Sequence, residues 1–466
     1  MSKNNIDMGK HLTTIDLLRY TTPSIAIVLF TSIYGIVDGF FISNYAGKTA
    51  FAAVNLIMPF IMILGTLGFM MGTGGGALVA QARGAGDNAK ANSRFSTIIW
   101  ASLIGGLILA ALGALFMEQV SLALGASDEM LADCVLYGRI SMISLAFFIL
   151  QFAFQPLFAT AGKPHLGFAI TVTSGLTNIV LDWLLVGVFG WGIVGAAGAT
   201  VASELFGGIA PLVYFLRPNS SFLRLGRPRA DWRLLGGVCV NGSSEMMSSI
   251  ASSVVAMLYN YQLMAYLGED GVSAYGVIMY AGMIFGAILQ GYCMGAAPLM
   301  SFQHGAKNGV EKRSLLRHAF GITAVMSNTM FLVCQLVCPF LCQLFVGYDQ
   351  ALYELTVHAF RAYALCLLFV YFSLVGSSTF TALGNGLVSA VISFTHTLVF
   401  ECGAVLLLPL LFGIDGIWYS ILVAEVAATI LVIALFFAFG RRYELRPFFC
   451  DKRGEAQKEA VAPATE

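Results

Sequence analysis

The sequence has few charged residues for its length. Of its 466 residues, 11% are Asp, Glu, Lys or Arg, whereas a soluble globular chain carries about 25%. Hydrophobic residues make up 58% of the chain, and the mean hydropathy is +0.81. This composition excludes an ordinary soluble domain and predicts an all-α polytopic membrane protein.

The sequence also lacks an excess of basic charge and any CxxC pair. Its 25 basic and 25 acidic residues cancel, so nothing indicates a nucleic-acid partner. Most of the nine cysteines lie in apolar runs, and Cys334, Cys338 and Cys342 recur every four residues. This spacing makes one stripe on a helix, which we interpret as packing rather than metal binding. We expect no cofactor.

Long hydrophobic runs dominate the chain. Crossing a bilayer takes about 20 apolar residues. The polar start MSKNNIDMGKHLTT leads into the first run without a small-residue cleavage site, so we expect a membrane helix there rather than a signal peptide. Twelve spans are predicted, at approximately residues 15–43, 52–80, 94–117, 129–158, 164–188, 194–217, 232–265, 271–302, 313–346, 353–382, 387–412 and 416–441.

The basic residues mark one side of the membrane. Nearly all lie in the N-terminal segment, in alternate loops, in the central linker and in the tail, while the opposite loops are acidic. The positive-inside rule therefore places both termini in the cytoplasm.

The two halves of the chain resemble each other at an offset near 221 residues. GGALVAQARGAGDNAKAN at 75–92 aligns with AAPLMSFQHGAKNGVEKR at 296–313, which pairs Gly84 with Gly305. FATAGKP at 158 aligns with FTALGNG at 380. We predict two six-helix lobes in parallel orientation: an N-lobe at 1–217, a cytoplasmic linker at 218–231, a C-lobe at 232–441 and a cytoplasmic tail at 442–466.

The stretch GTGGGALVAQARGAGD at 72–87 satisfies the glycine spelling of a dinucleotide-binding loop. That loop must follow a β-strand, and here the stretch is the end of the second span. We interpret the glycines as sites where helices approach closely and the chain turns.

Ionisable residues inside the spans are few, and each costs roughly 2.5–3.5 kcal/mol to insert at the bilayer centre. Asp38 lies in the first span, and Asn178 and Asp182 share one face of the fifth at i, i+4. Brought together, the two carboxylates suit a shared proton. With the neutral oxygens of Asn178 and Thr200, the same residues suit Na⁺.

Other polar residues in the spans allow two interpretations each. Glu245, in a serine-rich stretch of the seventh span, either faces a substrate cavity or makes an interhelical hydrogen bond. Glu401 is a weaker cavity candidate, and Glu204 and Glu425, at equivalent repeat positions, favour a scaffold role. Arg139 and Arg361 suggest snorkelling or structural pairs. Tyr34 can donate to Asp38, Pro23 is expected to bend the first span or merely kink it, and His396 stands alone.

Several motifs together resemble the multidrug and toxic compound extrusion (MATE) transporters: VDGFFISNYAG followed by AAVNLIMPF, GALVAQARGAGD with its echo APLMSFQHGAKN, and ATAGKP before the fifth span. The chain is most similar to MepA-like members of the DinF-type bacterial branch. The resemblance implies a V of two lobes in the bacterial cytoplasmic membrane that exports amphipathic, often cationic compounds in exchange for H⁺ or Na⁺. It also implies a coupling site at Asp38, Asn178, Asp182, Thr200 and Tyr34, with Pro23 bending the first span.

Alternative functions follow from the same architecture. A lipid-linked oligosaccharide flippase needs basic residues in its cavity, and the midspan charges here are acidic. An exporter of an endogenous metabolite fits the same fold. The sequence offers no intramembrane catalytic or metal-ligand group for an enzyme, and a channel fits the asymmetric acids poorly. We expect the lipid bilayer and small amphipathic substrates as partners, and a monomer.

Overall fold

The computed structural model describes residues 11–46, 48–228, 231–347 and 349–445, so the predicted tail beyond 445 lies outside the described residues. All regular secondary structure in the described part is helical, which confirms the all-α prediction. In particular, the glycine-rich stretch belongs to a helix and its turn, with no strand before it.

Ten described helical segments are long and apolar enough to cross a membrane. Uninterrupted α-helices form eight of them: α1 (Thr14–Phe41), α2 (Lys48–Gly84), α3 (Asn88–Leu115), α5 (Asp128–Thr160), α7 (Gly192–Leu216), α9 (Glu269–Gly305), α10 (Gly309–Val346) and α16 (Ser420–Phe439). Two contain a π-helical section: α6 (Pro164–Leu181) with η2 (Asp182–Val188), and α13 (Gly386–Phe394) with η4 (Thr395–Glu401) and α14 (Cys402–Phe412).

A bent pair of helices makes an eleventh candidate span. α11 (Gln350–Ala364) and the 3₁₀ turn η3 (Leu365–Leu368) meet α12 (Val370–Ala382) at 40°. α8 (Trp232–Leu267) is a 36-residue helix that is not among the candidates selected by length and hydropathy. The predicted count of twelve therefore stays a prediction that depends on α8. The short helices α4 (Met117–Ala123), α15 (Ile414–Trp418) and η1 (Ile42–Ala46) complete the fold.

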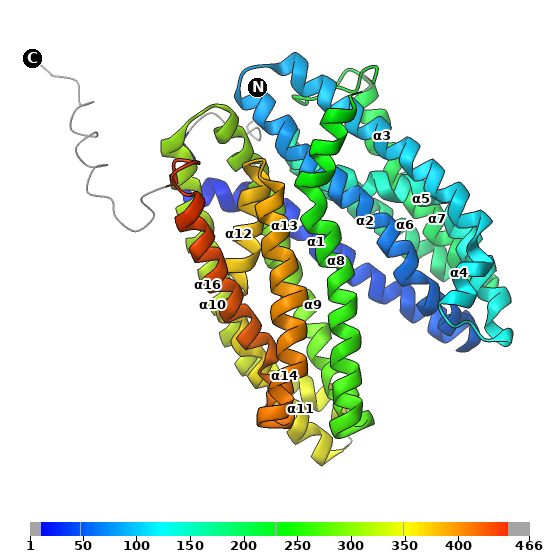
Figure 1. The fold of residues 1–466 in the computed structure, drawn as a ribbon. Coiled ribbons are helices and arrows are strands. Elements are labelled where there is room, and N and C mark those ends of the chain that lie inside the picture. Colours follow the sequence, from blue (N-terminus) through cyan, green and yellow to red (C-terminus); the bar gives the residue numbers. More distant parts are fainter. Residues whose placement is uncertain (1–10, 47, 229–230, 348, 446–466) are drawn as a thin grey trace, which may run out of the picture.

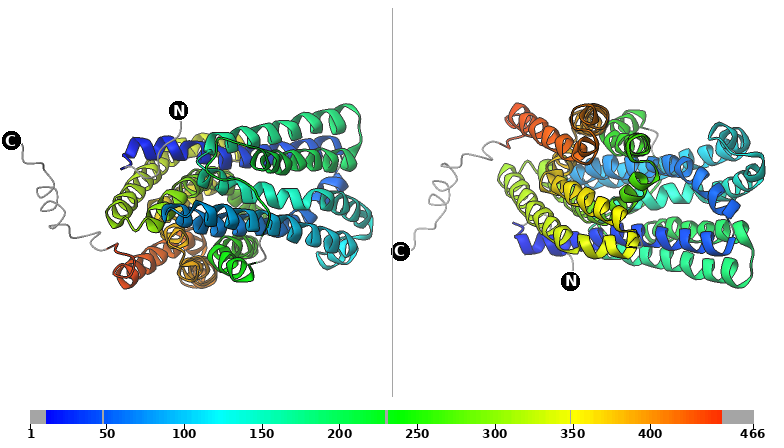
Figure 2. Two further views of the ribbon diagram at one scale, coloured as in Figure 1. Left: turned by 90° about the horizontal axis from the view of Figure 1, so that it is seen from above. Right: turned by 90° about the horizontal axis from the view of Figure 1, so that it is seen from below.

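The helices gather in two groups (Figure 1). Most of α1–α7, coloured blue to teal, lie to the right in Figure 1, and the green-to-red helices lie to the left. The views from above and below show the same division (Figure 2). The groups meet at the end of the bundle where α1 begins and α16 ends, which we call the terminal end, and they diverge toward the other end. The domain boundaries given above remain predictions.

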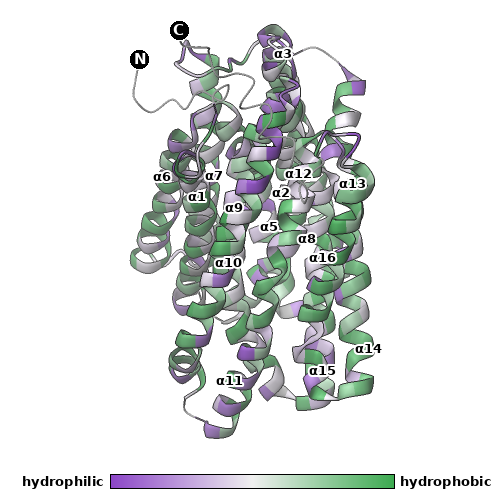
Figure 3. Ribbon diagram, turned by 90° about the vertical axis from the view of Figure 1, so that its left-hand side faces the viewer, coloured by the Kyte–Doolittle hydropathy of each residue, from purple (hydrophilic) through white to green (hydrophobic). Residues whose placement is uncertain are grey.

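Hydropathy follows the expected pattern for a membrane protein. Hydrophilic residues gather at the two ends of the bundle, and the helical lengths between them are largely hydrophobic (Figure 3). The cysteine stripe of α10 is buried in the second group, with Cys334, Cys338 and Cys342 at most 2% exposed. Its interpretation as packing is thus confirmed.

Glycines at equivalent repeat positions hold the two groups together. A Cβ at Gly84 of α2 would lie 1.9 Å from the carbonyl oxygen of Phe302, and a Cβ at Gly305 of α9 would lie 1.9 Å from that of Gln81. Because no side chain fits at either position, the ends of α2 and α9 touch through backbone. The contact is reciprocal, as expected of an internal repeat.

The first helix of each group, α1 and α8, makes a similar pair of reciprocal contacts. Gly295 of α9 faces the backbone of Thr21 in α1, and its repeat partner Gly74 of α2 faces Gly242 of α8. Gly291, one turn before Gly295, faces Ile25 of α1. Each group therefore packs its first helix against the second helix of the other group. The interpretation of the 72–87 glycines as close-approach sites is confirmed.

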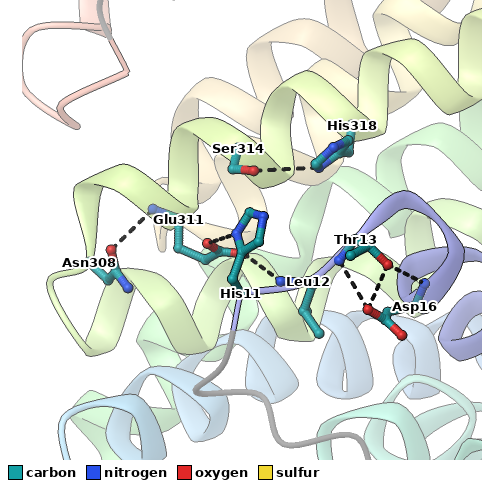
Figure 4. A network of polar contacts seen from close by, with 8 residues as sticks. All are labelled: His11, Leu12, Thr13, Asp16, Asn308, Glu311, Ser314 and His318. Carbon is teal, nitrogen blue, oxygen red and sulfur yellow. Dashed lines mark hydrogen bonds and ion pairs between the residues drawn. The ribbon is translucent and has the colours of Figure 1, made fainter. Parts of the chain in front are cut away.

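The segment before α1 is attached to α10 at the terminal end. One Glu311 oxygen lies 2.8 Å from His11 Nδ1, and the other accepts from the backbone N–H of Leu12 at 3.0 Å (Figure 4). The Thr13 side chain caps α1 in a capping box with Asp16. Glu311 is 5% exposed, so the contact with the Leu12 amide is shielded from water.

Replacing Glu311 with alanine is expected to loosen this attachment. A hydrogen bond to a charged group contributes about 1.5–3 kcal/mol, so the Leu12 amide should exchange its hydrogen at least about tenfold faster. The measurement is hydrogen exchange of peptides covering the start of α1. Glu311→Gln keeps an acceptor oxygen and should preserve most of the protection. Equal exchange in wild type and Glu311→Ala would show that the carboxylate does not hold the segment.

Candidate functional site

Asp38, Asn178 and Asp182 come together in the first group of helices. Asp38 lies near the end of α1, Asn178 lies in α6, and Asp182 begins the π-helical section η2. The three residues are 6%, 2% and 0% exposed. Asp38 contacts the side chains of both Asp182 and Asn178. The structure thus brings together the carboxylate pair that the sequence suggested.

A glycine explains how α1 comes close enough to α6. A Cβ at Gly175 would lie 2.5 Å from the Phe30 ring and 3.0 Å from the Tyr34 ring. Gly175, Asn178 and Asp182 follow at i, i+3 and i+7, so they share the face of α6 that α1 covers. Tyr34, one turn before Asp38, is thereby packed beside the group, and it lies within electrostatic range of Asp38 and Glu204.

Five oxygen atoms in and around the carboxylate pair have no hydrogen-bond partner of good geometry among the described residues. Within the described residues, no hydrogen bond reaches the buried atoms Asp38 Oδ1, Asn178 Oδ1, Asp182 Oδ1 and Oδ2, and Thr200 Oγ1. Unsatisfied buried oxygens are costly, and two contacting carboxylates repel unless a proton or cation lies between them. Carboxylate, amide and hydroxyl oxygens fit either a shared proton or a small hard cation.

A second layer of polar residues surrounds the pair, and most of these residues were not predicted from the sequence. The Tyr137 hydroxyl lies beside Thr200 and within electrostatic range of Asp38 and Glu204. Ser144 donates to the Glu204 carboxylate at 2.5 Å. Tyr137, Ser141 and Ser144 occupy i, i+4 and i+7 of α5. This spacing makes a polar stripe on an otherwise apolar span, and that stripe was the sequence pattern that could have identified them.

A cavity of about 340 Å³ lies between the two groups of helices. Both halves line it, with Thr73 and Thr160 on one side and Glu245, Gln290, Ser373 and His396 on the other. Among the described lining residues there is no Lys or Arg. Glu245 therefore lies where a cavity role requires. The Asp38 pair does not line the cavity, although Val28 of α1 does.

Glu401 lies behind the cavity wall in a second polar cluster. His396 Nε2 lies 3.1 Å from a Glu425 oxygen and 3.8 Å from a Glu401 oxygen. Ser373 donates to the other Glu425 oxygen at 3.1 Å. The view that His396 stands alone is wrong, because α13 continues as the π-helical section η4. Five residues span about 140° of an α-helix, but π-helical bonds join i to i+5 and bring His396 over Glu401.

The remaining predicted positions have simpler surroundings. α1 continues through Pro23 as one helix, so the structure assigns no break there. Arg139 is exposed and donates to the Ala114 carbonyl at 3.3 Å. A further histidine, the exposed His358, for which no role was predicted, pairs with Asp415 at 2.8 Å near the far end of the second group, outside the cavity.

Comparison with known proteins agrees with this architecture. A sequence model of the MatE family matches residues 23–184 and 246–403, which together exceed half of the chain. The chain belongs to the MatE family. MatE proteins are membrane transporters, so this chain is a multi-pass transporter and not an enzyme.

Individual MatE relatives are distant but match over most of their length. Multidrug export protein MepA of Staphylococcus aureus MRSA252 is 24% identical over 429 residues, covering 90% of this chain and 93% of its own. MepA of Staphylococcus saprophyticus is 25% identical over 427 residues, with the same coverage. A crystal structure of MATE in complex with MaL6 superposes with a TM-score of 0.87 at 19% identity, over 95% of this chain and 99% of that one.

Proposed function

We propose that this MatE protein is a secondary antiporter that exports amphipathic, often cationic compounds in exchange for H⁺ or Na⁺. The staphylococcal relatives named multidrug export proteins support the export of such compounds. The single observation that carries the exchange is the buried contact between Asp38 and Asp182, beside oxygens that have no hydrogen-bond partner among the described residues. We place it in a bacterial cytoplasmic membrane, as a monomer with both termini inside.

The coupling ion acts on α1 in this proposal. When the Asp38 pair loses its proton or Na⁺, the two carboxylates repel, and the contact between α1 and η2 weakens. α1 also packs against α9 at Thr21 and Ile25 and lines the cavity with Val28. Pro23 lies within this cavity-side part and leaves a backbone carbonyl unpaired, which eases bending. Movement at Asp38 is thereby transmitted to the cavity.

Exchange requires that the ion and the compound prefer different states. An ion that binds more tightly when the pair faces outward shifts the population toward that state by its differential affinity. Release of the ion on the inner side returns the protein to the state that binds the exported compound. No other energy source is needed.

The lining of the cavity favours cations over anions. A Glu245 carboxylate among largely apolar and hydroxyl-bearing walls attracts a lipophilic cation, whose apolar parts can contact the apolar walls. A flippase for lipid-linked oligosaccharides holds pyrophosphate, which the described lining, without Lys or Arg, does not favour. Export of a cationic endogenous metabolite remains compatible with the same site.

Replacing Glu245 with glutamine is expected to weaken binding of cationic compounds about tenfold, equal to about 1.4 kcal/mol, and to leave neutral compounds unaffected. The change removes the negative charge and keeps the shape. Fluorescence titration of the purified protein with paired cationic and neutral dyes measures it. Ser248→Ala, another lining position on α8, is the control. Equal losses for both dyes would show that Glu245 acts through shape rather than charge.

The function itself is tested by dye export from bacterial cells that express the protein. Cells with the wild type should retain less of a fluorescent lipophilic cation than cells with an empty vector, and collapse of the membrane gradients should abolish the difference. Equal retention of every cationic dye in the two strains would contradict the proposed substrate class.

A further inference from the structure

A buried histidine and two glutamates form a cluster in the second half that the proposed exchange at Asp38 does not use. We propose that His396, Glu401 and Glu425 form a second proton-binding site, which opens on the central cavity. The two sites are separate, because Asp38 and Asp182 belong to α1 and η2, while this cluster belongs to η4 and α16.

The three groups are close and shielded. An imidazole nitrogen of His396 and one carboxylate oxygen from each glutamate all lie within 4.8 Å of one another. The imidazole lies 3.1 Å from Glu425. Side-chain exposure is 17% for His396, 11% for Glu401 and 3% for Glu425. At this burial, water screens the charges little, so the protonation of one group strongly affects the others.

The charges of the cluster require a proton. With all three groups deprotonated it would carry two negative charges in a largely apolar interior, where an unpaired charge is strongly unfavourable. A proton on the imidazole reduces the net charge to one, and a second proton neutralises it. Ser373 donates to one Glu425 oxygen, and His396 Nε2 lies 3.1 Å from the other without making a hydrogen bond of good geometry to it. A proton on Nε2 therefore has an acceptor oxygen within reach, which favours proton binding.

Among the described residues, those around the cluster contribute hydroxyl and thiol groups but no positively charged side chain. Tyr259 of α8, Tyr275 of α9 and Tyr363 of α11 lie within electrostatic range of Glu401, and Cys366 of η3 lies within range of both glutamates. Glu245 of α8 lines the same cavity as His396. The Tyr259 hydroxyl is buried and has no hydrogen-bond partner among the described residues, so it is free to donate toward the cluster.

Access to the site is through His396. Its side chain and Ser373 line the cavity, whereas Glu401 and Glu425 lie behind them. A cation bound in the cavity repels a protonated imidazole, so binding of the exported compound expels the proton. This coupling rests on the proposed export of cations, whereas proton binding by the cluster does not.

The corresponding part of the first half, around Asp182 and Glu204, carries no histidine. Glu204, the repeat counterpart of Glu425, accepts from Ser144 much as Glu425 accepts from Ser373. At the offset of the repeat, the position of His396 is taken by Ser174 or Gly175. Both halves therefore place a serine hydroxyl on the repeated glutamate, although from different positions, and the second half adds an imidazole.

The test is a pH-difference infrared spectrum of the full-length protein in nanodiscs, recorded between about pH 5 and pH 8, where imidazole ordinarily titrates. Protons are the only probe, so the result does not depend on transport. We expect carboxyl and imidazole bands in the wild type that are lost together in His396→Gln and altered in both Glu401→Gln and Glu425→Gln. Asp38→Asn should keep them. His358→Gln removes an exposed histidine that also pairs with a carboxylate, and serves as the matched control.

Two results would overturn the proposal. One is an unchanged carboxyl region in all three cluster variants, each shown to be folded by its elution profile and unfolding temperature. The other is a wild type that shows none of these bands over the same pH range but binds Zn²⁺ tightly at micromolar concentration, with binding that His396→Gln abolishes, since this would identify a metal site instead. Failure of dye export with the bands present would contradict the proposed function alone.

Discussion

Asp38→Asn is expected to reduce gradient-driven export at least about tenfold, while membrane insertion and the unfolding temperature stay near those of the wild type. Asparagine keeps the shape and removes the charge, so the contact with Asp182 no longer depends on a proton or Na⁺. The difference in affinity between the two states that drives exchange then disappears. The measurement is the initial rate of dye efflux from energised vesicles.

Three further variants complete this experiment. Asp182→Asn should cause a similar loss, and the double variant should be no worse than either single one, because the pair acts as a unit. Asp128→Asn, at the exposed start of α5, is the control and should export normally. Full activity in Asp38→Asn would exclude the pair as the coupling site.

Gly305→Ala is expected to destabilise the protein by about 1–3 kcal/mol, as overpacking does in a close-packed core. The added Cβ would lie 1.9 Å from the Gln81 carbonyl oxygen, so the ends of α2 and α9 must separate. Because this contact joins the two groups of helices at the terminal end, export should fall as well. Thermal unfolding in detergent, followed by tryptophan fluorescence, measures the first effect.

Gly276→Ala on the same helix is the matched control. Its added Cβ would have no neighbouring heavy atom within 4 Å, apart from the adjacent residues and its own helical backbone. Replacing glycine with alanine inside a helix is favourable by about 0.8–1.0 kcal/mol, so this variant should be at least as stable as the wild type. Equal unfolding temperatures for the two variants would show that the interface tolerates separation.

The candidate residues of the first half were accessible from the sequence, because Asn178 and Asp182 follow ordinary α-helical spacing and Asp38 is one of few acids inside a span. Their pairing was a hypothesis, since no local pattern says which span approaches α6. Gly175, which allows that approach, looks like any other small residue until the Phe30 and Tyr34 rings are placed against it. The spacing of residues along one helix does not show which other helix packs against it.

The cluster of the second half was not accessible for a different reason. His396 and Glu401 are five residues apart, a spacing that puts them on different faces of an α-helix. Only the π-helical section brings them together, and no simple signal marks where such a section begins. The polar stripe that brings Glu245 to the cavity also lowers the hydropathy of α8. Because α8 is then not among the candidate spans, the predicted count of twelve is not confirmed.

The most direct test of the account is transport in proteoliposomes loaded with a fluorescent lipophilic cation, under an imposed proton gradient and then an imposed sodium gradient. The account predicts that at least one gradient drives the cation across the membrane against its own concentration, and that Asp38→Asn abolishes this movement. Wild-type flux that is independent of both gradients, or that only dissipates the gradient of the dye, would contradict a coupled antiporter.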